Sequence, residues 1–430
     1  METVKEKAQL QKYPAYQDSG VEWLDEIPEH WELRRFKYLF KEINERSIDG
    51  TEDLLSVSQY TGVTRKGDNI EDGDLLTNAS SLEGYKKVRK GDLVTNIMLA
   101  WNGSLGFSPF EGITSPAYSI YRLQRNNEER FFHYLLRTDR YKAEFKRNSS
   151  GVIESRLRLY SDDFFRILSL LPPVEEQTAI ATFLNEKCGK IDTAIAQKEK
   201  LIELLKERKQ IIIQNTVTRG LNPNVKMKES GVEWIGEIPE HWEVKALKYS
   251  TTLRSEKTIS KNSALPYLGL ENIESWTGSL VRTNSETEGQ ASRFYSGDVL
   301  FGKLRPYLAK VYLADQEGIC SGEILAFKAN EEMLNSFLHK VLLSYRFIDL
   351  IDSSTYGAKM PRANPTFIKL QMIPIPDLDE QQEIVKYIDD QTDKTDEAIV
   401  LQQQQIEKLK EYKSSLIDAA VTGKIKVTKD

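Results

Sequence analysis

The sequence lacks the features that mark secreted or membrane-spanning proteins. Its 430 residues include only 2 cysteines, Cys188 and Cys320, whose spacing fits neither a disulfide framework nor a metal site. No apolar run approaches the roughly 18 residues that a membrane span needs. The first dozen residues are polar and of mixed charge, which is not the pattern of a secretory signal. We therefore expect a cytoplasmic protein with buried thiols and no membrane partner.

The usual signatures of catalysis and cofactor binding are also missing. Neither G-x-x-x-x-G-K-S/T nor G-x-G-x-x-G occurs, so no phosphate-binding loop is indicated. A nuclease-like pattern, Asp139 with Glu144 and Lys146, falls on a helix-like stretch and is not duplicated in the chain. Four histidines occur without metal-ligand spacing: His30, His133, His241 and His339. We expect no catalytic, cofactor-binding or metal site in this chain.

The chain as a whole carries no excess of positive charge. Its 59 Lys and Arg residues and 65 Asp and Glu residues give a net charge of −6, which argues against coating of nucleic acid through an overall basic field. A local basic surface is compatible with this balance. One segment is positive, with Arg137, Arg140, Lys142, Lys146, Arg147, Arg156 and Arg158 against Asp139, Glu144 and Glu154. This segment is either a solvated face or a DNA contact.

The sequence does contain a long internal repeat. Residues 18–32 read DSGVEWLDEIPEHWE, and residues 229–243 read ESGVEWIGEIPEHWE, 211 residues later. This period is too long for a solenoid, whose repeats run to roughly 20–50 residues. The near-identity therefore indicates two copies of a domain-sized unit.

Further matched segments extend the repeat through most of the chain. They pair 89–98 with 295–304, 112–123 with 318–329, 169–180 with 372–384, and 190–210 with 394–414. We call all the matched segments the framework. Between them, residues 33–90 and 244–296 have diverged beyond easy alignment. A framework that is retained while the segments between its parts diverge is typical of one scaffold that carries two different recognition regions.

The globular parts are expected to have a mixed α+β fold. Short β-rich pieces such as DLVTNIM and YSIYRL are separated by turn signals, for example Asp49-Gly50 and Asn102-Gly103. One helix-like stretch interrupts them in each copy, at 128–146 and at 333–351. The pattern predicts globular domains at 1–172, with a repeated leading segment 13–32, and at 223–376.

A long helix is predicted after each globular domain, at 173–222 and, together with a tail, at 377–430. Prolines at 172–173 and at 374 and 376 precede the helices, where proline is well tolerated. Apolar residues then recur in steps of four and three, from Ile180 in one copy and Ile384 in the other, as in a coiled-coil seam. Polar residues occupy some seam positions, including Lys198, Lys209 and Gln402.

The two helices are expected to pair with each other. If a pseudo-two-fold axis relates the copies, the helices form an antiparallel coiled coil. A helix over 190–218 would be about 40 Å long. This length is close to one turn of B-DNA, about 34 Å. The pattern thus predicts a rod that holds two unlike domains at a fixed separation.

Several segments resemble the specificity subunits of type I restriction-modification systems. The resemblance covers residues 13–427 and lies in SGVEWIGEIPEHWE (230–243), SSTYGAKMPRANPTFIKL (353–370), IPIPDLDEQQ (373–382) and AAVTGKIKV (419–427). The first copy matches more loosely, with LPPVEEQ (171–177) and VTRGL (217–221).

The resemblance implies two target recognition domains, each reading one half of a bipartite, asymmetric site in double-stranded DNA. It also implies that the helices dock two modification subunits, which carry S-adenosylmethionine and methylate adenine at N6. Restriction subunits, using ATP and Mg, would translocate and cleave the DNA. The chain itself would be a non-catalytic recognition subunit without a cofactor.

Candidate DNA-contacting residues lie at matching places in the two copies. Phosphate contacts favour Arg and Lys, while base edges favour Arg, Lys, Asn and Gln. The candidates are Asn96, Trp101, Asn102, Arg156 and Arg158 in the first copy, and Lys303, Arg305, Tyr307, Lys359 and Arg362 in the second. For each of them, an exposed residue in a surface salt bridge is the alternative.

Three other functions remain open from the sequence. The chain could be the recognition subunit of a related system in which the modification and cleavage chains are fused. It could be a stand-alone nuclease, which would cut DNA without partners. It could also be a protein-binding scaffold, which would not retard a DNA duplex in a gel shift with the modification subunit present.

Overall fold

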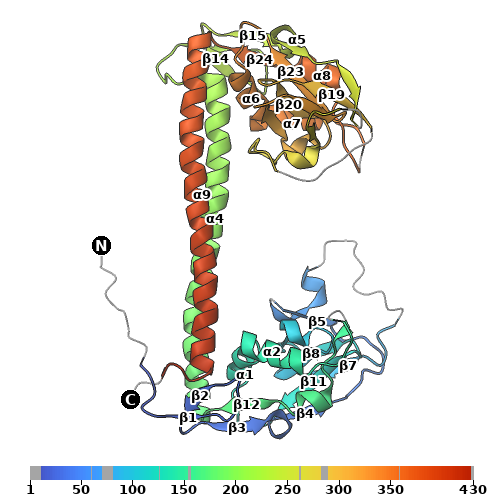
Figure 1. Cartoon of the computed structure of the whole chain (residues 1–430), viewed down its shortest axis with the longest axis vertical. Coiled ribbons are helices and arrows are strands. Elements are labelled where there is room, and N and C mark those ends of the chain that lie inside the picture. The colour runs from blue at the N-terminus through green and yellow to red at the C-terminus, as the bar shows by residue number, and fades with distance from the viewer. Residues whose placement is uncertain are drawn as a thin grey trace. The chain divides into compact units, whose positions relative to one another are not determined.

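The computed structural model describes residues 11–59, 61–69, 81–124, 126–153, 156–260, 263–281, 289–357 and 359–427. Within these residues, the chain forms two compact units (Figure 1). Unit 1 contains the described residues up to Gln197 and from Gln405 onward, and unit 2 contains Lys198–Gln404. Each unit combines a globular part with one half of each of two long helices. The domain boundaries predicted from the sequence stay predictions.

The mixed α+β fold expected from the sequence is confirmed in both units. The strands of unit 1 are β1 (Tyr16–Asp18), β2 (Glu26–Pro28), β3 (Glu32–Arg35), β4 (Phe40–Ile43), β5 (Leu55–Ser58), β6 (Gly62–Arg65), β7 (Lys86–Val88), β8 (Asp92–Asn96), β9 (Leu105–Phe107), β10 (Gly112–Thr114), β11 (Tyr118–Leu123) and β12 (Leu168–Leu171). Its short helices are η1 (Phe36–Tyr38), η2 (Lys66–Asn69), η3 (Ala100–Asn102), α1 (Glu129–Leu135), α2 (Asp139–Arg147) and α3 (Ser161–Phe164).

Unit 2 repeats most of this order. Its strands are β13 (Met227–Glu229), β14 (Glu237–Pro239), β15 (Glu243–Ala246), β16 (Thr251–Leu253), β17 (Lys257–Ile259), β18 (Tyr267–Leu268), β19 (Gln290–Phe294), β20 (Val299–Gly302), β21 (Val311–Leu313), β22 (Gly318–Ser321), β23 (Ile324–Ala329) and β24 (Met372–Ile375). Its short helices are α5 (Leu247–Ser250), η6 (Leu270–Asn272), η7 (Pro306–Leu308), α6 (Asn335–Leu343), α7 (Tyr345–Ser353) and α8 (Pro365–Leu370).

A four-stranded antiparallel sheet forms the centre of each globular part. Its order is β4-β11-β8-β9 in unit 1 and β16-β23-β20-β21 in unit 2. Because side chains alternate along a strand, the two faces of β8 contribute to different cores. Leu93 joins the large core that contains Phe132, and Val94 joins a smaller core with Leu55. The central sheet is therefore covered on both faces.

The layer over the second face differs between the units. In unit 1, it consists of two-stranded ladders, β5 with β6 and β7 with β10. In unit 2, it is a four-stranded sheet, β17-β19-β22-β18, in which β18 and β22 run parallel. Except for β10 and β22, these strands fall in the segments where the two copies diverge in sequence, 33–90 and 244–296. The divergence has thus changed one layer and left the central sheet intact.

The helix-like stretch expected in each copy is broken into two helices. In unit 1, α1 ends before Thr138, whose hydroxyl accepts a hydrogen bond from the amide of Tyr141 at the start of α2. In unit 2, Ser344 is extended, with φ of −66° and ψ of 139°, between α6 and α7. A Ser or Thr at the N-cap of a helix takes an extended backbone conformation. This conformation ends the preceding helix at that residue. The apolar periodicity continues across both breaks and does not reveal them.

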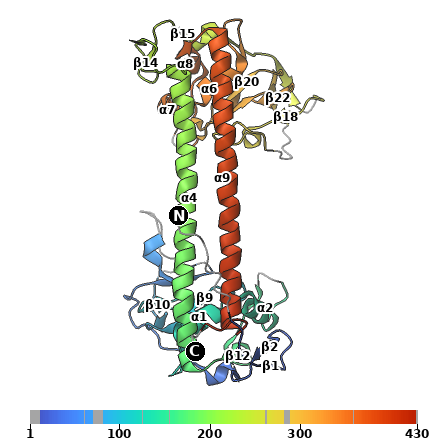
Figure 2. The same ribbon diagram turned by 90° about the vertical axis from the view of Figure 1, so that its left-hand side faces the viewer.

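The two long helices, α4 (Val174–Arg219) and α9 (Leu378–Val421), lie side by side within each unit (Figures 1 and 2). In unit 1, Ile180, Leu184 and Leu416 are buried in one core. In unit 2, the corresponding core contains Ile213 and Ile384. The predicted coiled-coil pairing of the helices is confirmed.

The polar seam residues pair across the helices. Lys209 Nζ lies 2.6 Å from Asp396 Oδ2 in unit 2, and Lys413 Nζ lies 2.6 Å from Asp192 Oδ1 in unit 1. Lys198 Nζ donates to Gln402 Oε1 at 3.0 Å. Within unit 2, the partner on α9 moves from 402 back to 396 as α4 advances from 198 to 209, so the helices are antiparallel. Polar pairs in a seam select one register at some cost in stability.

Candidate nucleic-acid interface

Each globular part is closed at its base by a two-stranded ladder. In unit 1, β3 pairs with β12, with Glu32 opposite Leu171. In unit 2, β15 pairs with β24, with Glu243 opposite Ile375. The chain therefore enters and leaves each globular part through neighbouring strands in the same register. The diverged residues lie between these strands, as an insertion into the framework.

A glutamate in the first turn of α4 binds the leading segment of unit 1. Glu176 Oε2 accepts a hydrogen bond from Trp31 Nε1 at 2.9 Å, and Glu176 Oε1 lies 2.6 Å from His30 Nε2. The next residue, Gln177, accepts from the amide of Glu128 at 2.9 Å and donates to the carbonyl of Pro172 at 2.9 Å. These contacts fasten the globular part to the helix.

Unit 2 uses the same contacts. Glu380 Oε2 accepts from Trp242 Nε1 at 2.8 Å and lies 2.9 Å from His241 Nε2. Gln381 accepts from the amide of Leu334 at 2.8 Å and donates to the carbonyl of Pro376 at 2.9 Å. In each unit, the His-Trp of the repeated Glu-His-Trp segment thus contacts the glutamate of the Glu-Gln pair in the first turn of the long helix.

In each unit, a buried aspartate at or next to the start of the central strand pairs with an arginine from a neighbouring segment. In unit 1, Arg122 donates to Asp92 at 2.8 Å and 2.9 Å. In unit 2, Arg254 donates to Asp298 at 2.9 Å and 3.0 Å. Neither pair is among the candidate DNA-contacting residues predicted from the sequence. The signal for the aspartates was present as the Gly-Asp that both copies share, but nothing in the sequence pointed to the arginines.

The loop after β8 carries the first three candidates of unit 1. Asn96 is buried, and its Oδ1 accepts from the amide of Met98 at 3.1 Å. Asn102 Oδ1 accepts from the hydroxyl of Ser104 at 2.8 Å. Trp101 donates to the carbonyl of Met98 at 3.0 Å and keeps part of its ring exposed. The two asparagine oxygens shape the loop, in which Met98 and Leu99 are exposed and Trp101 is partly exposed.

The equivalent loop after β20 is more strongly charged. Arg305 is exposed and has a φ of 50°, a left-handed conformation that is uncommon outside glycine. Tyr307 is 46% exposed, and its amide donates to Asp352 Oδ1 at 3.3 Å. Lys303 is partly buried and donates its amide to the carbonyl of Glu323 at 2.9 Å. The backbone therefore holds Arg305 and Tyr307 at the surface.

A short hairpin packs beside the loop in each unit. In unit 1, Ser150 and Arg158 exchange two backbone hydrogen bonds of 2.9 Å and 3.0 Å. In unit 2, Tyr356 and Arg362 exchange two of 3.2 Å and 3.1 Å. Arg158 and Arg362 thus occupy the same place in the two units. In each unit, the hairpin therefore brings an arginine that is distant in sequence next to the loop after β8 or β20, which we call the interface loop.

Backbone hydrogen bonds connect each hairpin to its loop. The amide of Leu159 donates to the carbonyl of Ile97 at 2.9 Å, and the amide of Ala363 donates to the carbonyl of Lys303 at 2.9 Å. The structure therefore brings together the two groups of candidates that the sequence places about 55 residues apart. Both groups lie on one edge of the globular part to which they belong.

The arginines of the hairpins differ in how they are held. Arg156 and Arg158 are exposed, and neither forms an ion pair with another residue in the described part of the chain. Arg362 is paired with Glu323, whose Oε2 lies 3.2 Å from its Nε. Lys359 is exposed. A phosphate contact by Arg362 would compete with Glu323, whereas Arg158 has no described carboxylate to leave.

Lys146 adds a basic group that the candidate list omitted. Its Nζ lies 5.4 Å from the centroid of the Trp101 ring. Arg137 and Arg140, from the same positive segment, have structural roles instead. Arg137 donates to the carbonyl of Gln59 at 2.6 Å, and Arg140 donates to the carbonyl of Trp23 at 2.7 Å. The positive segment therefore divides into a structural half and a half that lies near the loop.

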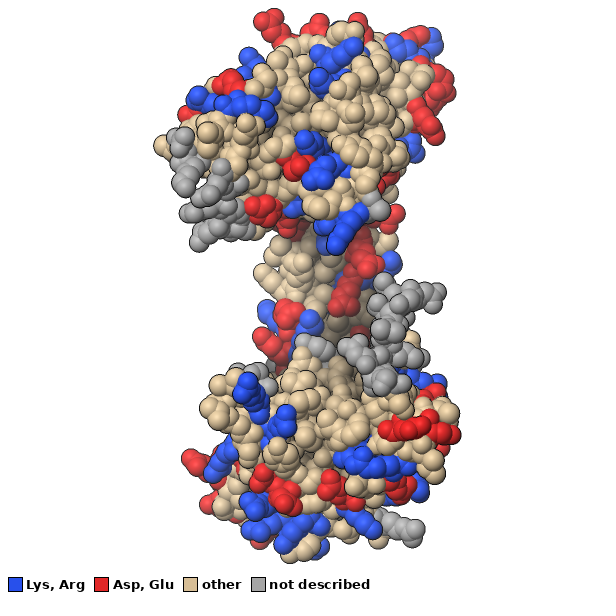
Figure 3. Space-filling view, turned by 90° about the vertical axis from the view of Figure 1, so that its right-hand side faces the viewer, with Lys and Arg blue, Asp and Glu red and all other residues tan. Residues whose placement is uncertain are grey.

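Figure 3 shows how charge is distributed on one face of the chain. On each globular part, Lys and Arg side chains alternate with Asp and Glu side chains, without a continuous basic field. This agrees with the net charge of −6. DNA contact by this chain would therefore depend on local clusters such as Trp101, Lys146 and Arg158.

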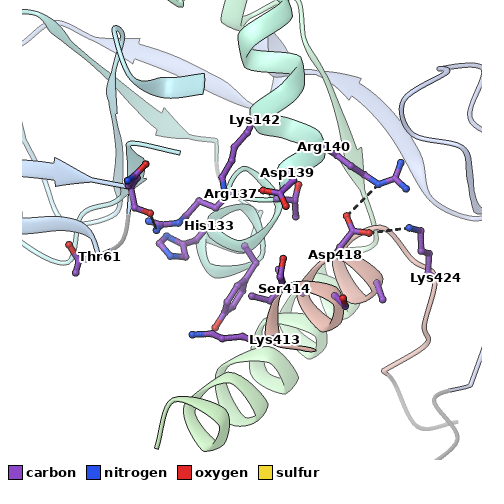
Figure 4. Close-up of a pocket in the computed structure, with 16 residues that line it drawn as sticks. Thr61, His133, Arg137, Asp139, Arg140, Lys142, Lys413, Ser414, Asp418 and Lys424 are labelled. Carbon is purple, nitrogen blue, oxygen red and sulfur yellow. Dashed lines mark hydrogen bonds and ion pairs between the residues drawn. The ribbon is translucent and has the colours of Figure 1, made fainter. Parts of the chain in front are cut away.

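A cleft of unit 1 lies between α2 and the last turns of α9 (Figure 4). Its volume is about 730 Å³, and charged side chains from both helices line it. Asp418 lies 3.4 Å from Arg140 and 3.0 Å from Lys424, while Lys413 pairs with Asp192. These charges compensate one another within the unit. The ion pairs in the cleft connect the globular part to the helix. Because most of the basic side chains there are paired, they are poorly available to an anionic ligand.

His339, which is buried, and His133, which is partly buried, are neutral in the folded chain. Burial lowers the pKa of His339 to about 4 and that of His133 to about 3, and neighbouring Lys340 and Arg137 act in the same direction. Below pH 6.5, the unfolded chain binds a proton at His339 that the folded chain does not bind. The contribution of neutral His339 to the free energy of unfolding is therefore fully present above pH 6.5 and is lost as the pH decreases towards 4.

Replacing His339 with Gln should weaken the dependence of stability on pH. In the original chain, His339 lowers the free energy of unfolding by about 1.4 kcal/mol for each pH unit below 6.5. Urea unfolding of both proteins at pH 7 and pH 5 measures the difference. If His339→Gln loses as much stability as the original chain between these pH values, this assignment is wrong.

The described residues contain no group of three or more His, Cys, Asp or Glu side chains that could hold a metal ion. Asp139 and Glu144, from the nuclease-like pattern, contact Lys142 and Asn148. Of the helices in the described part of the chain, none has the length and apolar character needed to cross a membrane.

Comparison with known proteins finds similar proteins of one class. Residues 239–411 match the family model described as the type I restriction modification DNA specificity domain. The chain is 24% identical over 314 residues to the type I restriction enzyme EcoDI specificity subunit of Escherichia coli, covering 68% of this chain and 69% of that protein. It is 25% identical over 429 residues to the MjaVIII specificity subunit of Methanocaldococcus jannaschii, covering 93% and 94%.

A solved structure shows the same fold. A chain from a study of complex assembly and conformational transition of the type I restriction-modification system superimposes with a TM-score of 0.67 at 16% identity, covering 92% of this chain and 98% of that one. The resemblance to type I specificity subunits is therefore confirmed. The matched domain and the relatives support the role of a subunit that recognises a DNA sequence.

Proposed function

We propose that this chain reads a bipartite, asymmetric DNA site and directs N6-adenine methylation or cleavage by partner subunits of a type I restriction-modification complex. One observation carries the proposal. The two units hold an interface loop and a hairpin with the same backbone contacts, yet the side chains on those loops differ. Loops that are held by the same backbone contacts but carry different side chains suit a protein that reads two different half-sites.

The side chains on the loops fit two kinds of DNA contact. Residues that are basic in both units, Arg158 and Arg362, suit phosphate contacts, which set the position of the protein on DNA. Residues that differ between the units at equivalent places, Trp101 against Tyr307 and Leu99 against Arg305, suit contacts that distinguish bases. Asn96 is buried and supports the loop from within.

The chain would work without its own catalytic group. In this proposal, two modification subunits supply S-adenosylmethionine and the methyltransferase site, and restriction subunits supply ATP-driven translocation, Mg and cleavage. A related system with fused modification and cleavage chains would use the same recognition subunit. The cross-helix pairs of α4 and α9 would hold one helix register and so one spacing between the half-sites.

Removing Arg158 should flatten the salt dependence of DNA binding. Each lost phosphate contact reduces the slope of log K against log salt concentration by about one unit. We expect this change for Arg158→Ala and for Lys359→Ala, and a smaller one for Arg362→Ala because of its pairing with Glu323. The measurement is a gel shift of a duplex containing the recognised site, with the modification subunit present, from 50 to 200 mM salt.

A matched control is Arg166→Ala. Arg166 is exposed, as Arg158 is, but it pairs with Asp163 of α3, outside the loop and the hairpin. Its slope should equal that of the original chain. An unaltered slope for Arg158→Ala and Lys359→Ala would remove these residues from the interface, and cleavage or methylation of DNA by the chain alone would overturn the proposed function.

A further inference from the structure

The internal repeat allows one unit to be compared with the other, residue by residue. Residues 33–40 read LRRFKYLF, and the equivalent residues 244–251 read VKALKYST. The only residues these windows share are Lys37-Tyr38 and Lys248-Tyr249. All four are exposed, whereas buried positions in the same windows have changed, as Phe36 has to Leu247. Surface residues have been kept where core residues were replaced.

Stability does not explain why this pair was kept. Tyr38 is 58% exposed and Tyr249 is 67% exposed. The Nζ of Lys37 lies 4.6 Å from the Tyr38 ring centroid, and the Nζ of Lys248 lies 4.7 Å from that of Tyr249. An exposed cation–π contact of this kind contributes only about 0.5–1 kcal/mol. Substitutions at exposed positions are usually close to neutral for folding.

Further exposed residues around each tyrosine are also shared. We define the duplicated patch as His30, Glu32, Lys37, Tyr38 and Val174 in unit 1, and His241, Glu243, Lys248, Tyr249 and Leu378 in unit 2. The aliphatic members are the first residues of the long helices and are 39% and 43% exposed. In both copies, four residues are identical and the fifth is aliphatic.

The residues of the patch lie close together within each unit. In unit 1, His30, Glu32, Tyr38 and Val174 line one hollow of about 360 Å³. In unit 2, the carbonyl of Tyr249 accepts from Asn330 Nδ2 at 2.8 Å, and Gln381, near the start of α9, donates to the carbonyl of Glu332 at 2.9 Å. The same short segment thus contacts the tyrosine and the first turn of the helix.

The chemistry of the patch points to protein and away from DNA. A tyrosine beside an aliphatic residue is the kind of anchor found at the centre of protein–protein interfaces. Glu32 lies 3.0 Å from Arg34 and Glu243 lies 2.9 Å from Lys245, so the charges of each patch are partly compensated within the unit. The residues proposed for DNA reading differ between the units, while the patch is the same. An identical surface on each unit suits two copies of one partner.

We propose that the duplicated patch is a docking site for a protein that binds in two identical copies, one to each unit. The partner would place an apolar hollow over Tyr38 or Tyr249 and acidic side chains opposite Lys37 or Lys248, because Glu32 and Glu243 are already paired with Arg34 and Lys245. The inference rests on the proposed function, in which this protein is the modification subunit. It locates the contact at the first turn of each long helix and the adjoining base of the globular part.

Stoichiometry with the purified modification subunit of the same system tests this proposal. In sedimentation velocity without DNA, the original chain should bind two copies. Tyr38→Ala and Tyr249→Ala should each bind one copy tightly and the other at least about tenfold more weakly. The double variant should bind both weakly. The matched control Tyr160→Ala, at an exposed tyrosine that is not repeated in unit 2, should bind two copies.

Charge-reversal variants and thermal unfolding separate docking from folding. Lys37→Glu with Lys248→Glu should weaken both copies, while the unfolding midpoint of every variant should match that of the original chain. Two copies bound at the original affinity by the double tyrosine variant would overturn the patch and leave the proposed function standing. Failure of the original chain to bind any modification subunit would overturn the proposed function itself.

Discussion

A chain in which residues 33–171 are replaced by its own residues 244–375 should recognise a site whose two halves are the same sequence in opposite orientations. The second globular part would then be present twice, on helices that are antiparallel within each unit. The half-site read by residues 33–171 should disappear from the methylation pattern. Mapping of methylated adenines in cells that also produce the modification subunit measures this.

The structure makes this exchange possible at defined junctions. Glu32 pairs with Leu171 in one ladder, and Glu243 pairs with Ile375 in the other, so both insertions start and end at the same register. The helix contacts of Gln177 also have counterparts in those of Gln381. The reciprocal exchange is the control and should produce an inverted repeat of the other half-site. Survival of the original asymmetric site in either chimaera would contradict the proposal.

Asp298→Ala should lower the free energy of unfolding of unit 2 by about 3 kcal/mol. Asp298 is 2% exposed and accepts two hydrogen bonds from Arg254 and one from the amide of Tyr295 at 2.9 Å. The substitution leaves a partly buried guanidinium and a backbone amide without their acceptor. Such an uncompensated group costs far more than the pair contributes. Urea unfolding followed by circular dichroism gives the value.

A surface pair in the same unit provides the control. Glu317 lies 2.9 Å from Arg293, but both side chains are substantially exposed. Glu317→Ala should therefore cost less than about 1 kcal/mol. Asp92→Ala should reproduce the large effect in unit 1, because Asp92 is 1% exposed and accepts two hydrogen bonds from Arg122. Equal losses for Asp298→Ala and Glu317→Ala would show that burial of the pair is unimportant.

The long-range organisation of this protein could be predicted because it rests on repetition and periodicity. The two copies of the EIPEHWE segment predicted two related units, and the four-and-three spacing from Ile180 and Ile384 predicted two paired helices. Polar residues at the seam, such as Lys209 and Lys413, were visible as interruptions. Only the structure supplied their partners, Asp396 and Asp192, because these lie on the opposite helix.

The details of the interface could not be predicted, for a similar reason. The arginine that binds the buried aspartate comes from β11 in unit 1 and from the end of β16 in unit 2. One role is thus filled from two different strands, so no spacing identifies it. Asn96 had the right chemistry for base contact, but its burial depends on how the loop folds over β8.

By itself, the sequence determined what is local or repeated: the duplication, the α+β character, the helices and their apolar seam, and the residue types available for DNA contact. The tertiary structure decided which of those residues are held inward and which project outward, because hydrogen-bond partners and burial depend on segments far apart in the chain. Arg158 and Trp101, 57 residues apart in the sequence, are joined through the backbone contact of Leu159 with Ile97. Tyr38 and Val174 meet around one hollow for the same reason.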